Sequence, residues 1–149
     1  MTREEFIKLL DDSEYSYEIE GDKIIVTYGG HVDLNSLTSL SPGVEFRNGG
    51  NVWLTSLTSL PPGVEFRNGG IVYLEALTSL SPGVEFRNGG SVILHSLTSL
   101  PPGIVFKNVG NVWLDSLIGG WFNEWNGNIE GIDSNTLLNL MIKQGVFEK

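Results

Sequence analysis

The heptapeptide Val44-Glu45-Phe46-Arg47-Asn48-Gly49-Gly50 decides the fold, because it returns unchanged at residues 64–70 and again at 84–90. A fourth copy at 104–110, Ile104-Val105-Phe106-Lys107-Asn108-Val109-Gly110, keeps the pattern with a few exchanges. Each copy begins twenty residues after the one before it. A fixed period of about twenty residues is typical of a solenoid, in which each coil stacks on its neighbours.

Each twenty-residue block contains two short strand-like pieces. The heptapeptide opens with one of them, and the other has the form of residues 51–55, Asn-Val-Trp-Leu-Thr. Both alternate with period two, which predicts an inward and an outward face. The residues expected to point inward are Val52, Leu54, Val64 and Phe66, with Leu57 and Leu60 in the bend; those expected outward are Trp53, Glu65 and Arg67. Pro-Gly and Asn-Gly-Gly are predicted to form the corners, since glycine accepts positive φ.

The ends of such a stack need covers. Thr2 and Glu5 fit a capping box before a helix to about Leu10, and residues 15–28 fit a hairpin with Gly21-Asp22 as a type II′ loop. At the other end we expect apolar cover and a helix over 134–144. The apolar residues there are Trp121, Phe122 and Trp125, and Asp133 or Ser134 is the expected N-cap.

These elements predict a mainly β, single-domain β-solenoid with twenty-residue coils. The expected organisation is an N-terminal helix and hairpin cap at 1–30, four and a half repeats at 31–118, and an aromatic and helical C-terminal cap at 119–149.

Composition excludes several classes of protein. The 149 residues carry a net charge of −9, which argues against binding a phosphate backbone. With no cysteine, the chain has no disulfides, thiolate metal sites or cysteine nucleophiles. The first residues do not read as a signal peptide, and no apolar run is long enough to cross a membrane. We expect a cytoplasmic protein, in the host cytoplasm if it is phage-encoded.

The phrase Leu57-Thr58-Ser59-Leu60-Pro61-Pro62-Gly63 resembles the Leu-Thr-Ser-Leu-Pro-x-Gly phrase of bacterial leucine-rich repeats. The resemblance spans residues 31–118 and implies a short solenoid of the kind found in bacteria and their phages. The asparagine that stands between the leucines of a leucine-rich repeat is absent. The sequence therefore leaves open either a horseshoe or a closed two-sided β-solenoid.

Comparing the repeats with one another singles out one face as a candidate binding surface. The second strand scarcely varies, and its Glu and Arg columns predict a solvated, self-neutralising surface. The first strand varies outward, and its central column would expose an apolar stripe with a polar rim, which is typical of an interaction site. The candidate partner-binding residues are Trp53, Tyr73, Ile93, Trp113, Asn51, Glu75, His95, Asn111 and Asp115.

Other uses of this face stay open. Aromatic side chains beside Asn, Glu, Asp and His also suit sugar rings, and stacked aromatics can serve stability alone. Single-stranded nucleic acid stacks on aromatics too, but it needs a basic groove that this face lacks.

An active site is not expected. Glu75, His95 and Asp115 share a column and could meet as a carboxylate–histidine–carboxylate cluster, but no nucleophile converges on them. We therefore predict no enzymatic activity, no cofactor and no metal.

Negative charge gathers at the N-terminus, where residues 1–22 hold eight acids against Arg3 and Lys8. An acidic cap suits a basic, nucleic-acid-binding groove on a partner protein and can steer association. Its central members are Asp11, Asp12, Glu14, Glu18 and Glu20. In architecture and charge the chain resembles inhibitors encoded by phages or bacteria, including DNA mimics and anti-CRISPR proteins. That resemblance implies a protein partner, no direct nucleic-acid binding and no membrane; an end-to-end homodimer is a further option.

Overall fold

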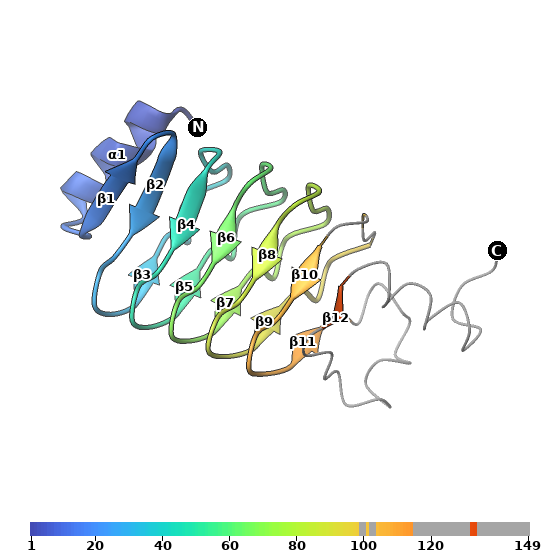
Figure 1. The fold of residues 1–149 in the computed structure, drawn as a ribbon. Coiled ribbons are helices and arrows are strands. Elements are labelled where there is room, and N and C mark those ends of the chain that lie inside the picture. Colours follow the sequence, from blue (N-terminus) through green and yellow to red (C-terminus); the bar gives the residue numbers. More distant parts are fainter. Residues whose placement is uncertain (99–100, 102–103, 115–131, 134–149) are drawn as a thin grey trace, which may run out of the picture.

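A computed structural model describes residues 1–98, 101, 104–114 and 132–133 of the chain. Its elements are one helix and twelve short strands (Figure 1). They are α1 (Arg3–Asp12), β1 (Tyr17–Glu20), β2 (Lys23–Val26), β3 (Val32–Asp33), β4 (Val44–Phe46), β5 (Val52–Trp53), β6 (Glu65–Phe66), β7 (Val72–Tyr73), β8 (Glu85–Phe86), β9 (Val92–Ile93), β10 (Val105–Phe106), β11 (Val112–Trp113) and β12 (Ile132–Asp133).

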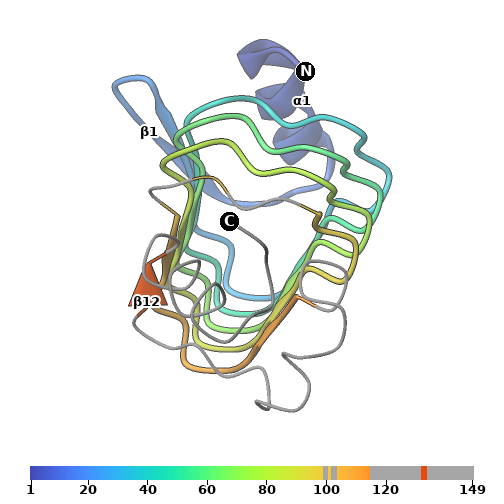
Figure 2. The same cartoon turned by 90° about the vertical axis from the view of Figure 1, so that its right-hand side faces the viewer.

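The strands form two sheets that run along the stack of coils. One sheet has seven strands in the order β1-β2-β4-β6-β8-β10-β12, and the other has five in the order β11-β9-β7-β5-β3. Viewed along the stack, the coils follow one another as nested closed outlines with a sheet on each of two walls (Figure 2). The predicted β-solenoid is confirmed. Its cross-section is the closed, two-sided form and not a horseshoe.

Adjacent coils pair in parallel and in register, so each residue lies beside its copy twenty residues away. Phe46 pairs with Phe66, and Phe66 with Phe86. These rings, continued by Phe106, stack inside the solenoid with centroids 5.1–5.2 Å apart. All the side chains predicted to point inward are buried. The period-two pattern therefore assigned the inner face of both strands correctly.

The predicted helix and hairpin of the N-terminal cap are confirmed, and the hairpin pairs directly with the first coil. Thr2 and Glu5 form the capping box of α1, which runs two residues beyond the expected end. Phe6 and Leu10 insert into the common core. In the loop of the β1–β2 hairpin, Gly21 has φ +60° and Asp22 has a negative φ, as a type II′ turn requires.

The second strand of the hairpin, β2, begins the parallel part of the seven-stranded sheet. β2 pairs in parallel with β4, so that Ile24 lies beside Val44. At the next corner the Gly49 N–H donates to the Tyr28 carbonyl at 3.0 Å. Stacking thus begins before the first recognisable repeat, inside the segment predicted to be a separate cap.

Buried asparagines tie the coils together at the corners that follow β4, β6, β8 and β10. Asn88 has no exposed surface, and its Nδ2 donates to the carbonyl of Gly70 in the preceding coil at 3.0 Å. The same Nδ2 lies 2.9 and 3.1 Å from the carbonyl oxygens of Gly90 and Ser91 in its own coil. Three further copies make the equivalent contacts: Asn48, Asn68 and Asn108. Each side chain therefore fixes its own corner and joins it to the coil before.

Glycine is needed at the two kinds of corner for different reasons. At the Pro-Gly corners, Gly43, Gly63 and Gly83 have φ between +74° and +84°, as predicted. The glycines of the Asn-Gly-Gly corners do not have positive φ, so that explanation is wrong for them. There a Cβ at Gly69 would lie 2.5 Å from the Gly49 carbonyl oxygen. Close approach of successive backbones is what excludes a side chain.

The C-terminal prediction falls mostly outside the described residues. This holds for Trp121, Phe122 and Trp125 and for the helix expected over 134–144. Asp133, one of its two possible N-caps, lies in β12, which pairs antiparallel with β10. The sequence patterns did not indicate this strand. In the part of the chain that the structure describes, no helix has the length and apolarity to cross a membrane.

The two glycine requirements predict different costs for alanine. Gly69→Ala should lower the free energy of unfolding by about 2–3 kcal/mol, since its Cβ overlaps backbone that cannot rotate away. Gly83→Ala should cost only about 1 kcal/mol, because its Cβ meets nothing within 4 Å and only the left-handed conformation opposes it. Urea unfolding followed by circular dichroism measures both. Equal losses would contradict the close-approach explanation.

The corner asparagines predict an unusual order of substitutions. Asn88→Ala removes the Nδ2 contacts and should cost about 1–3 kcal/mol. Asn88→Asp should cost more near neutral pH, because it buries a carboxylate against carbonyl oxygens without a donor. Burial raises the pKa of the new carboxyl, so its penalty relative to wild type should shrink as the pH falls through that pKa. Thermal unfolding from about pH 7 to about pH 4 tests this order. An Asn88→Asp variant as stable as Asn88→Ala throughout would refute the donor role.

Candidate functional site

The outer face of the five-stranded sheet carries one large side chain from each of four successive coils. β5, β7, β9 and β11 are in register, which aligns Trp53 with Tyr73, Tyr73 with Ile93, and Ile93 with Trp113. Each is partly exposed and partly covered by its neighbours in the column. We call these four residues the aromatic column.

Ring contacts hold the aromatic column in a defined arrangement. The rings of Trp53 and Tyr73 stack at an interplanar angle of 20°, with centroids 5.9 Å apart. His31 lies 5.1 Å from Trp53, and His95 lies 6.3 Å from Trp113, between ring centroids. Pre-ordered side chains lose little conformational entropy when a partner binds. Ring contacts therefore order Trp53 against Tyr73 and His31, and Trp113 against His95.

One flank of the aromatic column has a structural task that sequence comparison missed. Asn51 Oδ1 accepts a hydrogen bond from the Ile71 backbone N–H at 2.9 Å. In the same way His31 Nδ1 accepts from the N–H of Asn51, and Ser91 Oγ from that of Asn111. Asn51, predicted as a binding residue, thus also stabilises the stack. The sequence signal for this structural role was a hydrogen-bonding side chain at the same repeat position in three coils, namely His31, Asn51 and Ser91.

The opposite flank is more exposed. Glu75 and His95 occupy successive exposed positions of one column, as predicted. Asp115, the third member of the proposed cluster, lies outside the described residues. Among the residues that the structure describes, no three acidic or histidine side chains are grouped as a metal site would need.

The five central members of the acidic cap are all exposed, and two of them, Asp11 and Asp12, have bonding partners. Asp11 accepts a hydrogen bond from the Tyr17 hydroxyl at 2.8 Å, which raises the pKa of that phenol. Asp12 pairs with Lys8 at 2.7 Å. Glu14 is exposed and adopts a left-handed φ of +60° where the chain leaves α1. Glu18 and Glu20 are exposed on β1, with no ion pair to any described residue.

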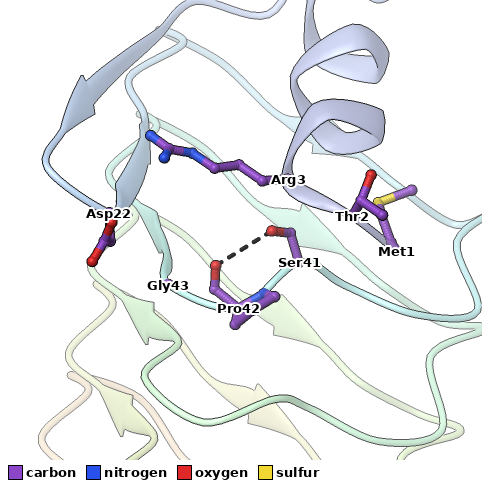
Figure 3. A pocket seen from close by; sticks show the side chains of 7 residues that line it. All are labelled: Met1, Thr2, Arg3, Asp22, Ser41, Pro42 and Gly43. Carbon is purple, nitrogen blue, oxygen red and sulfur yellow. Dashed lines mark hydrogen bonds between the residues drawn. The ribbon is translucent and has the colours of Figure 1, made fainter.

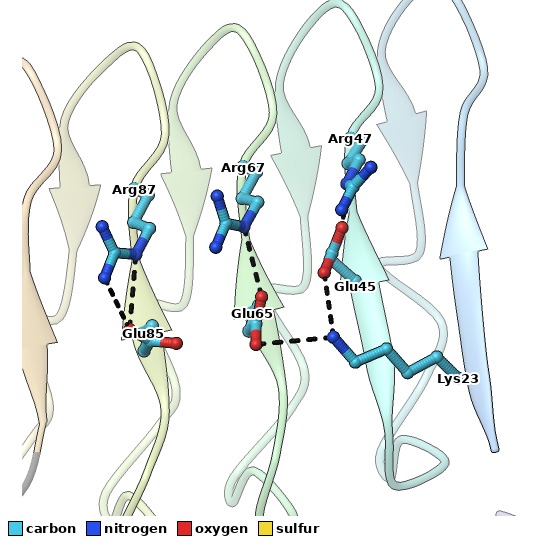
Figure 4. A network of polar contacts seen from close by, with 7 residues as sticks. All are labelled: Lys23, Glu45, Arg47, Glu65, Arg67, Glu85 and Arg87. Atoms are coloured by element: carbon cyan, nitrogen blue, oxygen red, sulfur yellow. Dashed lines mark hydrogen bonds and ion pairs between the residues drawn. The ribbon is translucent and has the colours of Figure 1, made fainter. Parts of the chain in front are cut away.

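The seven-stranded sheet presents a charged wall of a different kind (Figure 4). Within each of three successive coils Arg pairs with Glu, as in Arg67–Glu65 at 3.2 Å and Arg87–Glu85 at 2.9 Å. Lys23 of the hairpin lies across two coils, 3.4 Å from Glu45 and 3.7 Å from Glu65. The predicted self-neutralisation is confirmed in these pairs.

Glu45 departs from the prediction of a solvated ladder, since its side chain is only 2% exposed. It contacts both Arg47 and Lys23. Burial raises the pKa of the Glu45 carboxyl, but Glu65, Arg47 and Lys23 together lower it by more, so the pKa lies below its usual value. The charged wall is therefore an internal structural network at its N-terminal end. Lys23 carried no repeat signal that would have revealed this role.

The lowered pKa predicts how Glu45 contributes to stability. Its carboxylate stabilises the fold above the unfolded-state pKa of about 4.5, and the contribution disappears as the pH falls through the folded-state pKa. Glu45→Gln should therefore lower the melting temperature near neutral pH, with the difference from wild type vanishing in acid. Glu85→Gln, at a more exposed position without Lys23, should have a smaller effect. A pH-independent loss in Glu45→Gln would contradict the ionic role.

A pocket of about 480 Å³ lies at the seam between the N-terminal cap and the first coil (Figure 3). Arg3 lines it and donates through Nη2 to the Gly21 carbonyl at 3.1 Å. Ser41 lies fully buried in its wall and donates to the Pro42 carbonyl at 3.3 Å. Arg3 Nη2 and Ser41 Oγ thus bond to the chain itself, whereas Arg3 Nε is buried without a hydrogen-bond partner among the described residues.

Comparison with protein families, with curated proteins and with solved structures finds no match to this chain. The basis for a functional proposal is therefore the geometry of the chain itself.

Proposed function

We propose that the chain is a non-catalytic protein-binding module whose binding face is centred on the aromatic column. One observation carries the proposal. The outward side chains of the five-stranded sheet differ from coil to coil, although the core and corners repeat. Stacking alone does not require such variation, whereas recognition of an irregular surface does. Trp and Tyr are also the residues that most often anchor protein interfaces.

The residues around the aromatic column define its rim. Glu75 and His95 are its exposed polar neighbours, while Asn51 and Asn111 stand on the side that helps to hold the stack. A central apolar strip with polar edges is the usual anatomy of a protein interface. We therefore favour a protein partner over a sugar.

We further propose that the module acts as an inhibitor of the kind that phages or bacteria encode against defence systems, including anti-CRISPR proteins. The support is the concentration of exposed negative charge at one end of the chain, beside a nearly balanced solenoid. Such a distribution complements a basic groove on a nucleic-acid-binding protein and would speed encounter with it. The proposed place of action is the cytoplasm, where such partners work.

Paired substitutions on the aromatic column test the binding face. Trp53→Ala with Trp113→Ala should abolish capture of a stoichiometric partner from lysate of the source cell, because both large anchors are lost. Val109→Ser is the matched control, since Val109 is a 67% exposed apolar residue at a corner outside the column. The control should retain the partner.

Thermal unfolding of the same variants separates binding from folding. We expect the double variant to melt cooperatively with a loss of only a few degrees, since both side chains are partly exposed. Retained capture by the double variant would remove the aromatic column as the binding face. Collapse of its melting transition would instead assign the column to stability.

A further inference from the structure

β1 is the terminal strand of the seven-stranded sheet, and its outer edge is open. Among the described strands, β1 pairs only with β2. The hairpin that contains it projects beyond the outline of the coils (Figure 2). α1 reaches β1 through the Tyr17 hydroxyl, and the following three residues, Glu18, Ile19 and Glu20, are exposed.

The hairpin register identifies which backbone groups face outward. Glu18 lies opposite Ile25, and Glu20 opposite Lys23, across a two-residue loop. The Thr27 N–H donates to the Ser16 carbonyl at 2.9 Å, so Ser16 and Thr27 form a hydrogen-bonded pair. In an antiparallel ladder hydrogen-bonded pairs alternate with non-bonded ones, so the Glu18–Ile25 and Glu20–Lys23 pairs are hydrogen-bonded too. The N–H and C=O groups of Tyr17 and Ile19 therefore point away from β2. They form the open edge.

The side chains of β1 indicate what kind of strand this edge suits. Ile19 is 47% exposed, although it is a large aliphatic residue. Glu18 and Glu20 flank it on the opposite face of the strand, within a segment of eight acids and two bases. A second copy of the chain would bring its own Glu18 and Glu20 close to these, and like charges on paired strands are destabilising. A strand bearing lysine or arginine would find two unpaired carboxylates.

We propose that the open edge of β1 is a docking site for an extended, basic segment of a partner protein, which adds to the seven-stranded sheet as a further strand. Backbone hydrogen bonds to Tyr17 and Ile19 hold the segment, and its positive side chains lie beside Glu18 and Glu20. An apolar residue of the segment covers Ile19. This proposal rests on the proposed protein-binding function and gives the acidic cap a specific mode of binding, separate from the aromatic column.

A synthetic peptide tests the docking site without any knowledge of the natural partner. The probe is a short end-blocked peptide of alternating lysine and valine, added to the full chain. Amide hydrogen exchange measured by NMR should slow at Ile19 by about tenfold or more on saturation. The Thr27 amide, already bonded within the hairpin, should change little. A peptide of the same charge in which proline replaces valine cannot form the strand and should give no such protection.

Two sets of variants sharpen the result. Ile19→Pro removes the outward N–H but no β1–β2 hydrogen bond, so it should abolish peptide binding while the Thr27 amide stays protected. Ile19→Ala is its control and should retain the backbone contacts. Glu18→Gln with Glu20→Gln leaves the backbone intact and should weaken binding about tenfold. This double variant keeps the test decisive even if proline distorts the hairpin.

Several results would overturn the proposal. Peptide binding without protection of the Ile19 amide would mean that the acidic cap attracts the peptide by charge alone, without strand pairing. Equal binding of the proline peptide would mean the same. Self-association through β1 in sedimentation, lost on Ile19→Pro, would make a second copy the occupant. None of these results bears on capture through Trp53 and Trp113, so failure here is distinguishable from failure of the proposed binding face.

Discussion

A buried amide that must reach carbonyl groups in two successive coils is the constraint on which this structure depends. Asn88 satisfies it by donating to Gly70 in one coil and to Gly90 and Ser91 in the next. The backbones can approach closely enough only because Gly69 and Gly89 carry no side chain. Once these contacts are set, the register between coils is set too. The phenylalanine stack and both sheets follow from that register.

The outer faces of the two sheets carry different kinds of side chain. On the seven-stranded sheet, Arg and Glu side chains form ion pairs, as in Arg67–Glu65. Lys23 of the N-terminal cap pairs with Glu45 of the first coil. On the five-stranded sheet, the central outward residue differs from coil to coil, while Asn51 beside it bonds the following coil. Trp53, Tyr73, Ile93 and Trp113 stand on the second wall. A rigid frame beneath variable side chains is the arrangement that binding surfaces generally use.

The features that sequence alone could predict are those encoded by local order and period. The twenty-residue repeat, the inward direction of Phe66, the capping box at Thr2 and the hairpin all follow from neighbouring residues. What it could not predict depends on contacts between distant positions. Asn68 was understood only as a turn residue, because its partner Gly50 becomes a neighbour only after stacking. The burial of Glu45 needs Lys23 to fold across two coils, and no periodic signal marks that lysine.

The candidate site shows the same limit. Periodicity placed the aromatic column on one face and in the correct order, since parallel in-register stacking aligns equivalent positions. It gave Asn51 a single role, because the bond from Ile71 appears only when the next coil is present. The open edge of β1 was also hidden, since it depends on which backbone groups β2 consumes. Alternation of side chains says nothing about that choice until the hairpin register is known.

The near-identity of the middle coils has a consequence for how this protein can change over generations. The segments at 44–50, 64–70 and 84–90 match residue for residue, so recombination between copies of the coding sequence can remove or add a whole coil. The N-terminal cap would then meet the same surface as before. Each added coil would lengthen the molecule by about 4.8 Å and bring one more outward residue to the variable wall. The length of the binding face can thus change by one coil at a time while the fold stays the same.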